Sequence, residues 1–181
     1  NRVVFMSVPS GYETVAEGVV PKIHKVIDGN PATTERVDWT LTKVDNTDHI
    51  LYVLGDMHLA NRTNDLNQFN SFAADINEQI EANKGKRQYA VTLGDMSWDL
   101  YWYSNAYDLY SYIATINEKV KGIQIFHTIG NHDHDMNSAG DFNTVTAFKN
   151  SVAPTYYSFN IGDIHYIVLD NILCTNNGTG D

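Results

Sequence analysis

Three short motifs carry carboxylate, imidazole and amide groups that could together bind metal ions. They are Gly55-Asp56-Met57-His58, Gly94-Asp95-Met96-Ser97 and Gly130-Asn131-His132-Asp133-His134. Oxygen and nitrogen donors of these kinds suit divalent or trivalent first-row metals. One such motif is a weak signal, because Gly-Asp pairs are common in turns and Asp often caps a helix. Three in succession, each directly after an apolar run, favour a metal site over coincidence.

The spacing within the motifs indicates how the ligands would be shared. Asp56 and His58 are two residues apart on a loop that leaves a strand, so they can bind one ion together. Asp95 follows the next apolar run, and its two carboxylate oxygens could bridge two ions. The neutral amide oxygen of Asn131 comes from the third run. A glycine before each ligand lets the backbone turn sharply where the strand ends.

The elements that would position these motifs alternate along the chain. Apolar runs at 49–54, 88–93 and 123–129 are typical of strands buried on both faces of a sheet. Apolar residues spaced three and four apart predict helices over 66–80 and 109–120. This alternation predicts an α/β fold with parallel strands and right-handed crossovers. Because sites in such sheets form beyond the carboxyl ends of the strands, the three motifs should meet at one edge.

The remaining segments follow other patterns. Residues 156–160 and 165–169 flank a glycine-containing turn and predict a β-hairpin. Residues 1–46 do not fit the alternation, although strands are expected at 3–8 and 39–44. Fewer than about 50 residues rarely hold a core alone. They are therefore either the C-terminal part of a β-rich accessory module or strands that lean on the unit formed by the rest of the chain.

Composition excludes several classes of protein. The formal charge of −10 argues against a nucleic-acid partner, because a phosphate backbone attracts Lys and Arg. No apolar run approaches the roughly 20 residues of a membrane span. Cys174 is the single cysteine, so an internal disulfide and a thiolate zinc cluster are both excluded. The oligomeric state cannot be read from the sequence.

The ordered set Gly-Asp-x-His, Gly-Asp-x-x and Gly-Asn-His-Asp resembles the signature of calcineurin-like metallophosphoesterases, a family that includes purple acid phosphatases. The resemblance covers about residues 48–170. It implies two divalent or trivalent metal ions, such as Mn, Fe or Zn. By this resemblance Asp56, His58 and Asp95 bind the first ion. Asp95 and Asn131 bind the second.

The resemblance also implies a fold and a reaction. The fold is a β-sandwich core flanked by helices, of which residues 47–181 are the N-terminal portion. The reaction is hydrolysis of a phosphorylated small molecule or another phosphate ester by a hydroxide that two metal ions activate. His132 would be a non-ligand residue that assists the leaving group or steadies the transition state. Monoesters, diesters and pyrophosphates all remain open as substrates. Residues 7–12 loosely resemble an N-terminal module of bacterial members, which suggests an exported, periplasmic protein.

The sequence departs from the family pattern in one respect. The family's later motifs, a lone His and a Gly-His-x-His, supply three further ligands, and neither is present. His165 lies in the predicted hairpin and is a poor substitute. We therefore expect the natural protein to extend beyond Asp181 and these residues alone to bind metal weakly and be nearly inactive. The alternative is a non-catalytic surface or scaffold protein that retains a degenerate phosphoesterase fold.

Other polar residues near the motifs have competing interpretations. His127 lies within the third apolar run and is expected to be a hydrogen-bonded core histidine. His134 and Asp135 either support the site or belong to an ordinary solvated loop. Trp98 and Asp99 follow Asp95 closely and are expected to line the substrate cleft.

Overall fold

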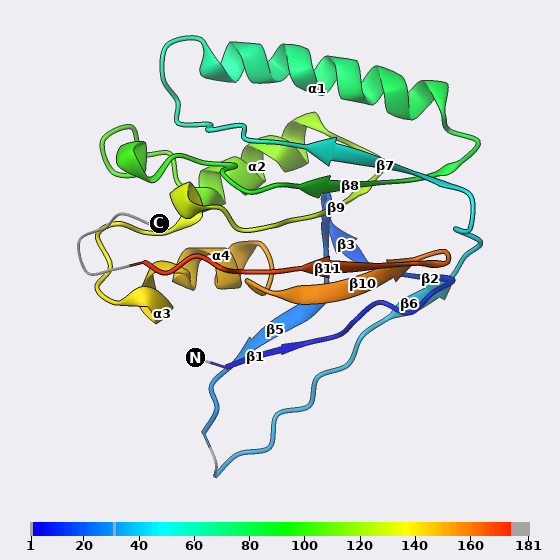
Figure 1. The fold of residues 1–181 in the computed structure, drawn as a ribbon, viewed down its shortest axis with the longest axis horizontal. Helices are drawn as coiled ribbons and strands as arrows, with labels where there is room; N and C mark the ends of the chain where they lie inside the picture. The colour runs from blue at the N-terminus through cyan, green and yellow to red at the C-terminus, as the bar shows by residue number, and fades with distance from the viewer. Residues whose placement is uncertain (1, 31, 175–181) are drawn as a thin grey trace.

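A computed structural model describes residues 2–30 and 32–174 of the chain. At its centre is a three-stranded parallel sheet in the order β7-β8-β9 (Figure 1). The strands are β7 (His49–Leu54), β8 (Arg87–Thr92) and β9 (Gln124–Phe126). Leu54 pairs with Thr92, and Val91 pairs with Phe126, so the strands end nearly level. The predicted α/β class and the parallel arrangement of the three runs are confirmed.

Two details of the sheet differ from the sequence prediction. β9 is only three residues long, because the chain leaves the sheet after Phe126. β7 is an edge strand, and its Val53 is 59% exposed, so β7 is not buried on both faces. The apolar pattern of an edge strand resembles that of a central one, which explains the wrong prediction.

The two long helices form where apolar residues recur at helical spacing. α1 (Asp65–Ala82) buries Phe69, Ala73 and Ile76. α2 (Leu109–Lys119) is capped by Asp108, whose carboxylate accepts from the Ser111 backbone N–H. An aspartate in this position satisfies a free N–H of the first turn. The short helices are η1 (Asp99–Tyr101), η2 (Asn131–Asp133), α3 (Asp141–Thr144) and α4 (Thr146–Ser151). Among the described residues, no helix combines the length and hydropathy required to cross a membrane.

The predicted hairpin is confirmed and packs against the parallel sheet. β10 (Tyr157–Ile161) pairs antiparallel with β11 (Ile164–Val168). The ring of Phe159 in β10 stacks on Phe126 of β9, with centroids 3.7 Å apart and planes 3° from parallel. The hairpin therefore lies beside β9, as Figure 1 shows.

The N-terminal segment consists of short antiparallel pairs that contact the rest of the chain. Val19 accepts a hydrogen bond from the Ile125 backbone (2.7 Å), and Val8 accepts one from Asn160 (2.9 Å). The division of the chain near residue 46 stays a prediction. β1 pairs with β5, β2 with β6 and β3 with β4, the bounds being Arg2–Phe5, His24–Ile27, Tyr12–Thr14, Leu41–Lys43, Ala16–Glu17 and Val20–Pro21.

His127 lies in the core, as expected, and its burial predicts that the stability of the fold depends on pH. The residue is 1% exposed, its Nε2 is 3.2 Å from the Tyr112 hydroxyl, and burial lowers its pKa to about 4. The unfolded chain binds a proton near pH 6.5 that the folded His127 does not bind. The free energy of unfolding is therefore highest, as far as His127 is concerned, above about pH 6.5. It falls by about 3 kcal/mol in total as the pH falls toward 4.

Urea unfolding measured between pH 7 and pH 4 checks this prediction. The free energy of unfolding should fall less steeply with acid in the His127→Gln variant than in the wild type. Identical pH profiles for the two proteins would show that His127 is not the titrating group.

Candidate metal centre

The loops that follow β7 and β8 run side by side beyond the strands. The His58 backbone N–H donates to the Asp95 carbonyl (2.8 Å), and the Leu59 N–H donates to the Met96 carbonyl (3.0 Å). Leu59 and Ser97 also form a parallel bridge. The first two motifs are therefore fixed to each other by backbone hydrogen bonds and not only by the strands before them.

Three candidate ligands have unusual backbone conformations. Asp56, His58 and Asp95 have φ angles of 47°, 46° and 51°, in the left-handed region that residues with a side chain rarely adopt. Each such conformation costs about 1–3 kcal/mol and is concentrated at functional sites. The surrounding structure holds all three in this state, which supports a functional role for the two loops.

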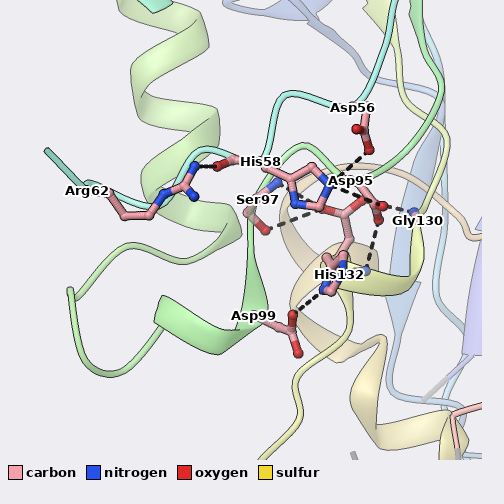
Figure 2. Close-up of polar contacts among 9 residues, drawn as sticks. Asp56, His58, Arg62, Asp95, Ser97, Asp99, Gly130 and His132 are labelled. Carbon is pink, nitrogen blue, oxygen red and sulfur yellow. Dashed lines mark hydrogen bonds and ion pairs between the residues drawn. The ribbon is translucent and has the colours of Figure 1, made fainter. Parts of the chain in front are cut away.

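The side chains of the first two motifs converge on one imidazole nitrogen. His58 Nε2 lies 2.9 Å from Asp56 Oδ1 and 3.6 Å from Asp95 Oδ2. Figure 2 shows the His58 ring beside these two carboxylates. The Asp56 side chain is 75% exposed, whereas that of Asp95 is 17% exposed. Two carboxylates and one imidazole thus meet at the rim of the sheet.

The third motif reaches the same place. The His132 backbone N–H donates to Asp95 Oδ1 (2.9 Å). Ligand atoms of His58, Asp95 and His132 all lie within 4.8 Å of one another. Asn131 precedes His132 as the first residue of η2. The structure therefore brings Asp56, His58, Asp95 and His132 together, with Asn131 adjacent in the chain.

A buried carboxylate joins the second and third motifs. Asp133 accepts hydrogen bonds from the Ser97 backbone (3.1 Å), the Ser97 hydroxyl (3.3 Å) and the Gly130 backbone (2.9 Å). Burial raises its pKa to about 7, although these donors act in the opposite direction. The sequence analysis predicts no role for Asp133, although its place in Gly-Asn-His-Asp makes it part of the third motif.

His132 is oriented by a second buried carboxylate. Its Nδ1 is 2.7 Å from Asp99 Oδ1, a contact drawn as a dashed line in Figure 2. Burial raises the pKa of Asp99, whereas the hydrogen bond with His132 lowers it. Asp99 was expected to line the substrate cleft, but it is 6% exposed and lies against His132 instead. This contact leaves Nε2 of His132 as the nitrogen that could act on a substrate or a metal.

A family model of calcineurin-like phosphoesterases matches residues 50–180 of the chain. The chain belongs to this family. No curated protein and no solved structure matches the chain. The matched region begins in β7 and includes all three motifs, so the resemblance noted in the sequence is confirmed. Membership in the family implies a hydrolase that acts on phosphoester bonds.

The residues of this phosphoesterase fit a bound metal ion. Carboxylates and imidazoles are ligands of first-row metals, and those of Asp56, His58 and Asp95 already converge. His58 Nδ1 is buried and has no hydrogen-bond partner among the described residues. Nε2 contacts Asp56 and faces Asp95, so it is the nitrogen that would hold an ion together with these two carboxylates, whereas Nδ1 faces away from them.

The phosphoesterase site has further neighbours that the sequence only partly indicated. The Trp98 ring lies 4.9 Å from the His58 ring and 5.7 Å from the His132 ring, so Trp98 packs against both histidines. Its place in a substrate cleft stays a prediction. His134 is fully buried, with its Nδ1 2.9 Å from the Thr144 hydroxyl, and is not part of a solvated loop. Asp135 orders the following loop through the Asn137 backbone and the Ser138 hydroxyl.

Two glycines let the second and third motifs of the phosphoesterase approach closely. A Cβ on Gly94, whose φ is 96°, would lie 2.7 Å from the Gly130 Cα. A Cβ on Gly130 would overlap the side chain and backbone nitrogen of Asp95. We expect Gly130→Ala to lower the free energy of unfolding by about 2 kcal/mol, because the overlap must displace the loop.

Urea unfolding of Gly130→Ala and Gly85→Ala tests this expectation. A Cβ on Gly85 would meet no atom within 4 Å, so that variant is a matched control and should unfold like the wild type. Equal stabilities of the two variants would contradict the close packing of the motifs.

Proposed function

We propose that this phosphoesterase hydrolyses a phosphate ester with the help of two metal ions, such as Mn, Fe or Zn. Asp56, His58 and Asp95 would hold the first ion, and Asp95 and Asn131 would contribute to the second. The observation that carries the proposal is the convergence of Asp56 and Asp95 on Nε2 of His58. When bound, such ions supply a nucleophile derived from water near neutral pH and hold phosphate oxygens.

Asp95 is suited to lie between two ions. Its Oδ2 faces His58 of the first motif, whereas its Oδ1 faces the backbone of His132 in the third motif. The two oxygens of one carboxylate therefore face the first and the third motif. The Asp95 backbone is also fixed by the His58 N–H, which limits how far the carboxylate can move.

His132 is proposed to act on the leaving group rather than on metal. Asp99 binds Nδ1 and fixes the ring, so Nε2 is the nitrogen that can meet the charge developing on the leaving oxygen. The substrate is proposed to be a phosphorylated small molecule or another phosphate ester.

The family's β-sandwich is proposed as the complete architecture. The stack of Phe126 on Phe159 is the contact that would join its two sheets. In this proposal, the β10–β11 hairpin belongs to the second sheet.

The function is tested by turnover of an aryl phosphate monoester and an aryl phosphate diester. In the assay the protein is first stripped of metal with a chelator and then supplied with Mn²⁺, Fe²⁺ or Zn²⁺. We expect hydrolysis to disappear with the chelator and to return with at least one metal. Turnover that survives metal removal would contradict the proposal.

A further inference from the structure

Arg62 contacts the backbone of a proposed metal ligand. It lies in the loop between β7 and α1, four residues after His58, and its Nη2 donates to the His58 carbonyl (3.1 Å). Figure 2 shows the guanidinium at this carbonyl, with His58 lying in this view between Arg62 and the carboxylates of Asp56 and Asp95. Because His58 has a left-handed backbone, a hydrogen bond to its carbonyl helps to hold a conformation that the residue would otherwise leave.

Arg62 also contacts the ring that packs against the His58 side chain. Its Cζ lies 4.6 Å from the Trp98 ring centroid and 5.6 Å from that of Tyr101. The Trp98 ring in turn meets the His58 ring in an edge geometry at 4.9 Å. Arg62 therefore supports His58 twice, through the backbone directly and through the ring by way of Trp98.

The position of Arg62 is itself fixed by Asp65. Asp65 Oδ2 accepts hydrogen bonds from the backbones of Ala60 and Arg62, both at 3.0 Å, and lies 3.5 Å from Arg62 Nε. Asp65 is buried, and the Arg62 side chain is 35% exposed. The guanidinium is thus held by a carboxylate, a carbonyl and an aromatic face, which leaves it little freedom to reach a ligand.

We propose that Arg62 is a positioning residue that holds His58 in the orientation that binds metal. This inference rests on the proposed function, because it takes His58 as a ligand. Arginine is suited to the role because a planar guanidinium can stack on Trp98 and donate in its own plane at the same time, whereas a lysine ammonium cannot. The competing role for a cation near such a site is direct contact with a substrate phosphate.

The test measures Mn²⁺ affinity without substrate, from the electron paramagnetic resonance signal of free Mn²⁺. Changing the partners that orient a ligand typically weakens metal binding 10- to 100-fold, and we expect at least about a tenfold loss for Arg62→Ala. Arg62→Lys should lie between Arg62→Ala and the wild type. Arg36→Ala is the matched control, because that side chain is 86% exposed and pairs with Asp38, and its affinity should not change.

The outcomes separate this inference from the proposed function. Wild-type Mn²⁺ affinity in Arg62→Ala would overturn the inference. A raised KM for substrate in the same variant would then make Arg62 a substrate contact. If Arg62→Ala does not fold by circular dichroism, Arg62→Lys decides, and wild-type affinity in that variant overturns the inference. Equal affinities of the wild type and Asp95→Asn would instead refute the metal site itself.

Discussion

Replacing Asp95 by asparagine is expected to weaken Mn²⁺ binding by at least about a hundredfold. Residues that only orient a ligand contribute up to about that much, and a ligand itself should contribute more. The change removes the negative charge that faces His58 and leaves one oxygen where the proposed site uses two. A carboxylate is also a stronger ligand than an amide for a hard or borderline cation. Titration calorimetry with Mn²⁺ measures the effect.

Asp163→Asn is the control for this experiment. Asp163 is an exposed residue in the turn of the β10–β11 hairpin, and its substitution removes the same charge. The control should bind Mn²⁺ like the wild type. If both variants bound Mn²⁺ equally well, Asp95 would not be a ligand, and the proposal that it contributes to both ions would fail.

Replacing His132 by alanine is expected to lower turnover about a hundredfold or more, the usual scale for a general acid. Metal content should stay unchanged, because the backbone N–H of residue 132 that binds Asp95 is retained. Turnover of an aryl phosphate and metal content by elemental analysis are measured on the same samples. His165→Ala provides a control, since His165 is an exposed histidine of the hairpin.

The two measurements together separate the possible roles of His132. A ring nitrogen of His132 lies within 4.8 Å of the ligand atoms of His58 and Asp95. A direct bond from His132 to the metal is therefore the competing role. Loss of metal together with turnover would make His132 a ligand rather than an acid. Unchanged turnover would remove it from the mechanism.

The arrangement of the motifs could be predicted because the physics that places them is simple. Apolar runs that alternate with amphipathic helices make parallel strands, and parallel strands end at the same edge. Asp56, His58 and Asp95 could therefore be expected to meet without knowledge of any loop. The hairpin was equally clear, because two alternating runs flank a turn that contains Gly162.

The contacts that support the ligands could not be predicted in the same way. Arg62 reaches His58 because Asp65 folds the intervening loop, and no periodic pattern encodes such a loop. Asp99 lies against His132 because η1 turns it inward, although an aspartate after a motif equally suits a cleft. The N-terminal strands are two to four residues long, too short for a hydrophobic period to appear.

A crystal structure with Zn²⁺, with the ions located by anomalous scattering, tests the central claim most directly. We predict a peak about 2.0–2.2 Å from His58 Nε2 and from a carboxylate oxygen of Asp95, the usual zinc distances. Asp56 should lie beside the same peak, and Asn131 should face the opposite side of the Asp95 carboxylate. A fully soaked crystal with no ion at this rim, or with ions bound only elsewhere, would contradict the account.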